Sequence, residues 1–193
     1  MNKEIIILGS TGSIGTTTLS VIKEQNFKII LLSTDKNAKK LLNQAILFKV
    51  KDVIIEDEVQ YKKYKELFNK NKIRIYLGLI NLKRILKKKV NYCINSISGI
   101  DGLSPTLDVI PFTQNILIAN KESIICGWSI INKISIKYNT KIIPIDSEHF
   151  SILKLLDNHE LKEIKKIYLT ASGGPFLNYK PNQLKSISPQ LAL

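Results

Sequence analysis

The sequence predicts an α/β protein built on a doubly wound parallel sheet. A β-branched run, Glu4–Leu8, ends at a glycine-rich loop, and Thr16–Glu24 follows it with apolar residues at helical spacing. Strand-like and lysine-rich, helix-like segments then alternate along the chain. With 193 residues, the chain has room for one full domain of this kind and part of a second.

The later strands are predicted from short runs rich in isoleucine, leucine and valine. These runs are Lys28–Leu32, Asp52–Ile55, Ile73–Tyr76, Tyr92–Asn95 and Asn115–Ile118. The more polar segments between them can form helices. Strands separated by helices form parallel sheets with right-handed crossovers, so we expect a Rossmann-like dinucleotide-binding fold.

A second region is predicted from residue 141 onward, so the expected domains are 1–140 and 141–193. The second region opens with the strand-like Lys141–Ile145 and a helix-like stretch to about Leu156. A strand near Ile164–Thr170 and a glycine turn at Gly173-Gly174-Pro175 follow, the start of an α+β domain. No linker or repeat separates the regions, so we expect close packing and a site in the crevice between them.

Composition narrows the classes of partner. The formal net charge is +13, but the lysines are spread along the chain and few aromatic residues interleave with them. The abundance of isoleucine, lysine and asparagine is typical of AT-rich coding, so we expect no nucleic-acid partner. The charge favours small anionic substrates.

Cysteine usage and hydropathy point to a reduced, non-membrane protein. Cys93 and Cys126 lie in separate apolar segments, so neither a disulfide framework nor a zinc site is indicated and both are expected to be reduced core residues. No run approaches the roughly 20 apolar residues of a membrane span, and the N-terminus enters a strand rather than a signal sequence. We expect a cytoplasmic protein, or a plastid stroma protein whose transit peptide is gone.

The loop Gly9-Ser10-Thr11-Gly12-Ser13-Ile14-Gly15 spaces three glycines three apart, between a strand and a helix. Glycines there permit a tight turn and close approach to a pyrophosphate, which the N-terminal N–H groups of the helix stabilise. Glycine-rich turns after strands also occur for packing alone. The context favours dinucleotide binding.

The choice of cofactor depends on the end of the second strand. Asp35 lies twenty positions after Gly15, where an acid commonly binds the ribose 2′-hydroxyl of NAD. Lys36, Asn37, Lys39 and Lys40 surround it and could pair with a 2′-phosphate. We expect NADPH, with a solvated run of charges as the alternative.

The second chemical signal is Asp146-Ser147-Glu148-His149, directly after a strand. Its two carboxylates, at i and i+2, can face one point and suit a hard divalent cation such as Mg²⁺ or Mn²⁺. The same residues could equally form a helix N-cap. A histidine beside acids is more often a hydrogen-bonded neighbour than a metal ligand.

Two further polar segments fall where ligands are expected. Ala119-Asn120-Lys121-Glu122-Ser123 stands at the carboxyl end of a strand, the edge where open α/β sheets bind ligands, although helix capping explains it as well. Ala171-Ser172-Gly173-Gly174-Pro175-Phe176 offers a hydroxyl and backbone N–H groups to a phosphate, although a plain turn explains it nearly as well.

Taken in order, these four motifs resemble the 1-deoxy-D-xylulose 5-phosphate reductoisomerase family. The motifs are Gly-Ser-Thr-Gly-Ser-Ile-Gly, Ala-Asn-Lys-Glu-Ser, Pro-Ile-Asp-Ser-Glu-His and Ser-Gly-Gly-Pro-Phe, from residue 9 to residue 176. The resemblance implies NADPH-dependent rearrangement and reduction of 1-deoxy-D-xylulose 5-phosphate to 2-C-methyl-D-erythritol 4-phosphate, in the non-mevalonate isoprenoid pathway. It also implies a homodimer for the full-length protein.

The resemblance implies a role for each motif residue. The expected cofactor-binding residues are Thr11, Gly12, Ser13 and Ile14 at the pyrophosphate, Asp35, Lys36 and Asn37 at the adenosine end, and Asn120 and Glu122 at the nicotinamide. The expected metal ligands are Asp146 and Glu148, the substrate contacts are Lys121, Ser147, Glu148 and Ser172, and the catalytic residues are Glu148 and Lys121.

This sequence departs from the family pattern at several points. Asp35 stands where the family has a small residue, which weakens the expectation of NADPH. In the helix after the acidic motif, Phe150 replaces a small or polar residue, Ser151 replaces an alanine and Lys154 replaces a glutamine. The family continues beyond this length with a tryptophan-bearing loop, for which Trp128 does not stand in, and with a further acidic metal ligand, so we expect the 193 residues alone to be inactive.

Two other functions fit the fold. One is a different nucleotide-dependent dehydrogenase, such as a semialdehyde or homoserine dehydrogenase, which would not call for the acidic pair. The other is a non-catalytic nucleotide-binding module, which would bind cofactor without turnover.

Overall fold

The computed structural model describes residues 3–168 and 174–192, which divide into two compact units, Met1–Phe150 and Ser151–Leu193. The first unit contains seven strands: β1 Lys3–Leu8, β2 Phe27–Thr34, β3 Asp52–Ile55, β4 Arg74–Leu77, β5 Val90–Asn95, β6 Thr113–Ile118 and β7 Lys141–Pro144. Its α-helices between the strands are α1 Ser13–Lys23, α2 Ala38–Leu47, α3 Glu58–Lys70, α4 Leu82–Ile85, α5 Leu103–Val109 and α6 Lys121–Tyr138. Helix α7, Ser147–Leu156, begins in this unit.

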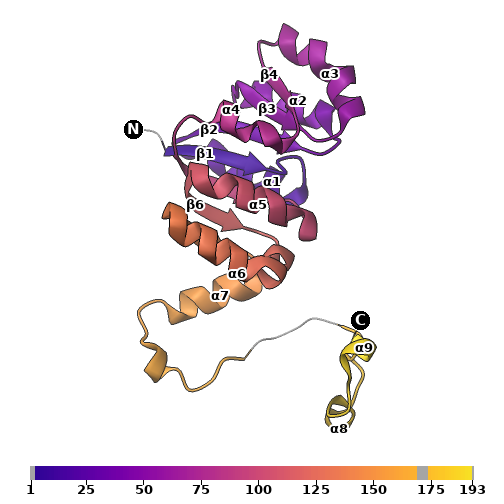
Figure 1. The fold of residues 1–193 in the computed structure, drawn as a ribbon, viewed down its shortest axis with the longest axis vertical. Helices are drawn as coiled ribbons and strands as arrows, with labels where there is room; N and C mark the ends of the chain where they lie inside the picture. The colour runs from indigo at the N-terminus through magenta and orange to yellow at the C-terminus, as the bar shows by residue number, and fades with distance from the viewer. Residues whose placement is uncertain (1–2, 169–173, 193) are drawn as a thin grey trace. The chain divides into compact units, whose positions relative to one another are not determined.

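The strands form one parallel sheet in the order β4-β3-β2-β1-β5-β6-β7. The chain winds outward from β1 to β4, returns to β5 beside β1, and winds outward again, so β3 and β4 lie to one side of β1 and β6 to the other (Figure 1). This is the predicted doubly wound topology. The reversal at β1 and β5 creates a switch point between their carboxyl ends.

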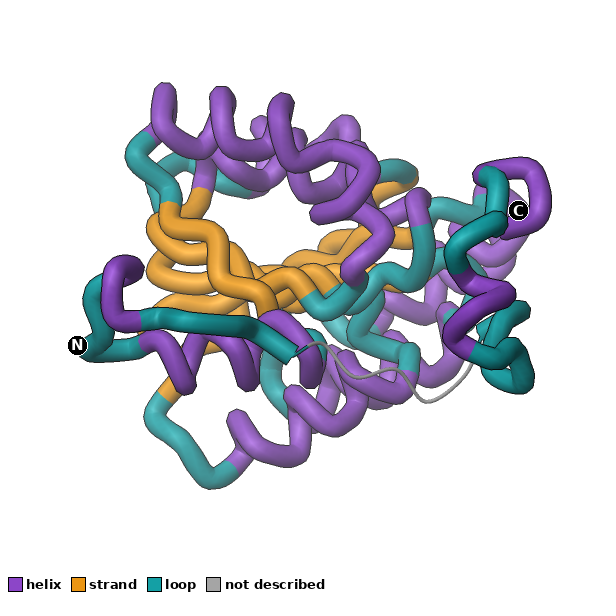
Figure 2. Tube along the Cα trace, turned by 90° about the horizontal axis from the view of Figure 1, so that it is seen from below, coloured by secondary structure: helices purple, strands orange, loops and turns teal. Residues whose placement is uncertain are grey.

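The sheet lies between two layers of helices, and Figure 2 shows the strands as a middle layer with helices above and below. Successive strand residues face opposite layers. Ile5 and Ile7 of β1 join a core with α1, α2 and α3, whereas Ile6 and Leu8 join a second core with α4, α5 and α6. Burial of both faces explains why the strands read as nearly continuous apolar runs.

Several helix ends are fixed by side chains next to the carboxyl edge of the sheet. Asn37, Asp57 and Asn120 are the N-cap residues of α2, α3 and α6, and each accepts a hydrogen bond from a backbone N–H three residues on. Asn139 ends α6 in a left-handed conformation at φ 48°. The three N-cap side chains satisfy N–H groups that the first turns of the helices leave unpaired.

The predicted strands of the first unit are confirmed, with ends that differ by a few residues. The strand predicted at Ile164–Thr170 is wrong for residues 164–168, which form a loop, while residues 169–170 lie outside the described part. An extended segment becomes a strand only with a hydrogen-bonded neighbour, and the paired strands of the described chain end at Pro144. The apolar pattern cannot reveal the missing neighbour.

The cysteine prediction is confirmed for Cys93 and wrong in part for Cys126. Both are free, but only Cys93 is buried, where loss of solvation raises the pKa of its thiol. Cys126 is exposed on α6, whose buried residues, such as Gly127 and Ile131, lie on the other side of the helix. A helix beside a sheet buries only one side, so an apolar neighbourhood in sequence does not ensure burial.

The second unit is small and contains short elements. It includes a 3-10 turn at Leu161–Glu163, α8 Pro181–Leu184, α9 Pro189–Ala192, and an edge-to-face ring pair between Phe176 and Tyr179 with centroids 5.2 Å apart. Within residues 3–168 and 174–192, no helix has the length and apolar character needed to cross a membrane.

Candidate functional site

The glycine loop leaves β1 at the switch point and turns sharply into α1. Gly9 has φ +73°, and a Cβ there would lie 3.1 Å from the backbone of Ser96 and Ile97 after β5. Gly15 lies against the loop itself, since a Cβ there would approach the Gly9 carbonyl oxygen to 2.4 Å. Gly9 therefore permits the turn and Gly15 permits the close packing of α1 against the loop.

Two buried hydrogen bonds between Ser10 and Gln44, here called the Ser10–Gln44 clamp, hold the glycine loop in place. Ser10 Oγ donates to Gln44 Oε1 at 2.8 Å, and Gln44 Nε2 donates to the Ser10 carbonyl oxygen at 2.9 Å. Both residues are buried, and the Ser10 N–H also donates to Ser33 O on β2. The clamp fixes the loop backbone to α2 and β2 before any ligand arrives.

The upper part of the loop is held at a second point. The Thr11 and Thr34 hydroxyl oxygens lie 2.6 Å apart, and Lys40 Nζ donates to the Thr11 carbonyl oxygen at 2.8 Å. Ser13 and Ile14 begin α1, whose N-cap residue is Gly12, and no side-chain cap takes up the first N–H groups of this helix in the described chain. An anion seated there would meet these N–H groups and the Lys40 ammonium.

Two cavities flank the loop at the carboxyl edge of the sheet. The larger, about 660 Å³, lies beyond β2, β3 and β4 and is lined by residues that include Gly9, Thr34 and Asp35. The smaller, about 200 Å³, is lined by residues that include Ile14, Asn120 and Glu122. Ile97 lines both cavities, so they are neighbours at the switch point, where doubly wound folds bind dinucleotides.

The residues expected at the adenosine end follow β2. Asp35 and Lys36 are both exposed, and Lys36 Nζ lies 4.0 Å from Asp35 Oδ2. Asn37 is engaged as the cap of α2, where its Oδ1 accepts from the Lys40 N–H at 3.1 Å. Asp35 alone of the three lines the larger cavity.

The segment after β6 combines a cap with a site-facing acid. Asn120 Oδ1 accepts from the Ser123 N–H, and Asn120 Nδ2 donates to Ile97 O at 2.6 Å. Its side chain is buried and fully engaged in these structural contacts. Glu122 lies in the first turn of α6 and lines the smaller cavity, and Lys121 reaches instead toward Glu148, at 3.3 Å.

The acidic motif begins α7, just after β7 at the same edge of the sheet. One carboxylate oxygen of Asp146, Oδ1, accepts from the His149 N–H at 3.1 Å and lies 2.7 Å from His149 Nδ1. The other oxygen, Oδ2, is buried and has no hydrogen-bond partner among the described residues. The cap interpretation therefore accounts for one oxygen and leaves the second available to a ligand.

Glu148 is held as an anion. A hydrogen bond from Ser147 Oγ at 2.8 Å, a backbone N–H and the Lys121 ammonium lower the pKa of the Glu148 carboxyl to about 2. The ionised Glu148 carboxylate and the buried Asp146 oxygen, two positions apart at the start of α7, are both oxygen donors of the kind that a hard divalent cation takes. In the described part of the chain no group of three or more His, Cys, Asp and Glu side chains converges, so a cation held here would take its further ligands from outside the described residues, from water or from substrate.

One expected contact, Ser172, lies outside the described residues, as do Ala171 and Gly173. Sequence reasoning missed three groups that shape the site: Gln44, which clamps the loop, and Ser96 and Glu56, which follow β5 and β3. The position of Ser96 and Glu56 after strands could have indicated them. No local pattern marks Gln44, because its partner lies thirty-four positions away.

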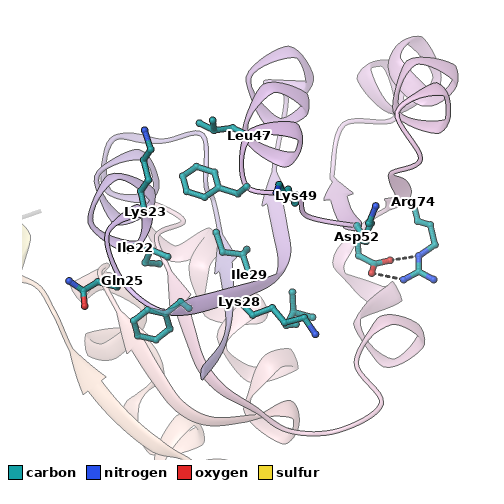
Figure 3. A pocket seen from close by; sticks show the side chains of 13 residues that line it. Ile22, Lys23, Gln25, Lys28, Ile29, Leu47, Lys49, Asp52 and Arg74 are labelled. Atoms are coloured by element: carbon teal, nitrogen blue, oxygen red, sulfur yellow. Dashed lines mark hydrogen bonds and ion pairs between the residues drawn. The ribbon is translucent and has the colours of Figure 1, made fainter. Parts of the chain in front are cut away.

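The opposite, amino edge of the sheet carries another large cavity, of about 650 Å³ (Figure 3). Lys23, Lys28 and Lys49 lie around it, and Arg74 is bound to Asp52 through two hydrogen bonds of 2.7 Å. The helices α1 and α2 end here, and lysines are favoured near the negative end of a helix. The helix ends explain Lys23 and Lys49, and Lys28 pairs with Glu4 at 3.4 Å. None of the described residues that line this cavity belongs to a motif.

The family model described as 1-deoxy-D-xylulose 5-phosphate reductoisomerase matches residues 5–127, and the model of its C-terminal domain matches residues 142–193. The chain belongs to this family.

Curated members of the family align with nearly the whole chain. The reductoisomerase of Pelagibacter ubique (strain HTCC1062) is 49% identical and that of Clostridium novyi (strain NT) is 40% identical, each over 99% of this chain. The alignments cover 50% and 51% of those proteins. This chain spans about half the length of the curated relatives it matches.

Solved reductoisomerase structures share the fold. The enzyme of Zymomonas mobilis in complex with NADPH matches with a TM-score of 0.83 at 28% identity, over 100% of this chain and 51% of that one. A reductoisomerase in complex with NADPH, fosmidomycin and magnesium matches with a TM-score of 0.79 at 31% identity, over 98% of this chain and 50% of that one.

Proposed function

We propose that this chain is the cofactor- and metal-binding half of a 1-deoxy-D-xylulose 5-phosphate reductoisomerase. The observation that carries the proposal is the meeting of two motifs at one edge of the sheet. Lys121, in the motif that follows β6, pairs with Glu148 of the acidic motif at 3.3 Å. The glycine loop lies at the same edge, and family membership supports the activity. Two relatives of known structure are described with NADPH, and one of these also with magnesium.

NADPH would lie across the switch point. Thr11, Gly12, Ser13 and Ile14 would hold the pyrophosphate at the start of α1, where backbone N–H groups are available. Asp35, Lys36 and Asn37 would meet the adenosine end, and Glu122 with the Asn120 backbone would meet the nicotinamide. The engagement of the Asn120 side chain supports a positioning role for it.

Mg²⁺ or Mn²⁺ would be held by Asp146 and Glu148. The buried Asp146 oxygen without a partner supports this assignment, and His149 would orient that carboxylate through its other oxygen. When bound, such an ion polarises the ketose carbonyl and its neighbouring hydroxyl as a Lewis acid. Ser147 and Ser172 would contact the sugar phosphate.

Lys121 and Glu148 would act at the reacting end of the substrate. Their ion pair holds the Lys121 ammonium beside the carboxylate, so a substrate oxygen placed there would find both a donor and an acceptor. The glycine loop and the start of α6 would align the nicotinamide with the aldehyde formed by rearrangement, so that hydride transfer completes the reduction.

The remaining expectations belong to the same proposal. Residues 1–140 would form the NADPH-binding domain and 141–193 the beginning of the catalytic domain, a division supported by the second family model, which begins at residue 142. Cytoplasmic location, a homodimeric full-length protein and the absence of nucleic-acid and membrane partners remain predictions.

The proposal is tested by joining residues 1–193 to the remaining half of the Pelagibacter relative. The chimera should oxidise NADPH only when both substrate and Mg²⁺ are present, whereas the 193 residues alone should bind cofactor without turnover. Asp146→Asn in the chimera should abolish turnover and leave NADPH affinity within about twofold, since the carboxylate does not belong to the loop.

The alternatives predict other results. If the Asp146→Asn chimera kept its turnover and its metal dependence, Asp146 would act only as a helix cap and not as a metal ligand. Cofactor binding by the chimera without any turnover would favour a non-catalytic module, and metal-independent reduction of another aldehyde would favour a different dehydrogenase.

A further inference from the structure

The larger cavity beside the glycine loop is acidic in a strongly basic protein. The chain has 29 lysines and arginines against 16 aspartates and glutamates. Yet four carboxylates line this cavity, and no lysine or arginine is among its described lining residues. The four acids are Asp35, Glu56, Asp101 and Asp108.

These acids come from both halves of the fold. Asp35 follows β2 and Glu56 follows β3, and the two strand ends are tied together by a hydrogen bond from the Glu56 N–H to Thr34 O at 3.1 Å. Asp101 and Asp108 approach from the turn Ile100–Gly102 and from α5. In doubly wound folds the space beyond the second strand holds the adenosine ribose.

The negative charges of neighbouring carboxylates affect the pKa of Glu56. The pKa of the Glu56 carboxyl is raised, first by partial burial and then by the charges of Asp35 and Asp108, although a hydrogen bond from the Leu79 backbone opposes the rise. A 2′-phosphate would bring further negative charge into this field. Ribose hydroxyls and an adenine amino group would instead donate hydrogen bonds to the carboxylates.

Two of the three nearby lysines are already engaged. Lys36 Nζ lies 4.0 Å from Asp35 Oδ2, so the Asp35 charge offsets part of its attraction for a phosphate. Lys40 donates to the Thr11 carbonyl oxygen and lies on the pyrophosphate side of the loop. None of Lys36, Lys39 and Lys40 is among the described residues that line the cavity.

We propose that Asp35 and Glu56 set the cofactor specificity of this site and relax it, so that NADH binds with an affinity within about tenfold of that of NADPH. The inference rests on the proposed function only in assuming that a nicotinamide dinucleotide occupies the site. It assigns a role in specificity to Glu56, a residue that belongs to none of the four motifs.

Titration of the 193-residue chain with NADPH and with NADH, at about pH 8, tests the proposal. The wild-type ratio of the two dissociation constants should be below about ten. Asp35→Asn should tighten NADPH binding at least about fivefold, because it removes a charge that repels the 2′-phosphate, and should not tighten NADH binding, because the ribose hydroxyls lose a charged acceptor. Glu56→Gln should act in the same direction. Glu66→Gln makes the same change of charge on the exposed surface of α3, outside the cavity, and should alter neither affinity.

Each other outcome has a definite meaning. A wild-type preference for NADPH well above tenfold, or unchanged NADPH affinity in both Asp35→Asn and Glu56→Gln, would overturn the inference and leave the proposed function standing. Failure of the folded chain, checked by its melting transition, to bind either cofactor would overturn the proposed function and the inference together.

Discussion

At the scale of single residues, the spacing of the three glycines predicts the loop, and the structure gives two of them different tasks. Gly9 takes a positive φ and Gly15 makes room for a backbone contact. Both follow from local chain geometry, which is why a sequence pattern can indicate them. The Ser10–Gln44 clamp follows from the docking of α2, which no local pattern encodes.

Gly15→Ala should unfold the loop. The new Cβ would lie 2.4 Å from the Gly9 carbonyl oxygen and 2.6 Å from Ser10 Cα, so the backbone must move. We expect the free energy of unfolding to fall by about 2 kcal/mol or more and NADPH binding to be lost. Gly12→Ala is the matched control for folding stability, because its Cβ would meet Gly9 O at 3.4 Å. Urea denaturation compares the two variants, cofactor titration compares Gly15→Ala with the wild type, and wild-type behaviour of Gly15→Ala in both would refute the packing role.

Glu56→Gln should stabilise the protein at high pH. The raised pKa means that the folded protein binds the Glu56 proton more tightly than the unfolded chain does, so the ionised form destabilises the fold. This cost is fully present above the folded pKa and disappears below the ordinary value of 4.5. We expect a gain of about 0.5 kcal/mol near pH 8 that is lost as the pH falls through the folded pKa toward 4.5. A gain that grew as the pH fell would contradict the assigned cause, and Glu66→Gln serves as control.

At the scale of elements, apolar periodicity predicts the strands of the sheet well, because both faces of each are covered by helices. It fails at Ile164–Tyr168, where the pattern is present but no neighbouring strand pairs with it among the described residues. Pairing is a property of two segments. The roles of residues at helix starts are only partly predictable from sequence. By sequence, Asn37 and Asn120 could be helix caps or ligand contacts, and in the structure both side chains cap helices.

Asn120→Ala should weaken the start of α6. It removes the acceptor for the Ser123 N–H and the donor to Ile97 O, so we expect the free energy of unfolding to fall by about 1–2 kcal/mol without cofactor present. Asn120→Asp keeps the acceptor and loses the donor, so its stability should be intermediate in urea denaturation. Equal stability of all three proteins would show that the cap contributes little.

At the scale of the whole molecule, the order of the motifs predicts the family, and the parallel topology explains why motifs far apart in sequence share one edge. Strands β1, β5, β6 and β7 all point the same way, so the segments that follow them meet. The sequence could not predict that large cavities lie at both edges, one acidic and one bordered by lysines, because cavity lining depends on how helices dock.

The central claim, that the cofactor binds at the carboxyl edge between β1 and β5, is tested most directly by amide hydrogen exchange of the 193-residue chain with and without NADPH. We expect slower exchange in the glycine loop and in the segments after β5 and β6, residues 9–16, 96–99 and 119–122, and no change around Lys23, Lys28 and Lys49 at the amino edge. Protection at the amino edge, with the glycine loop unchanged, would contradict the account.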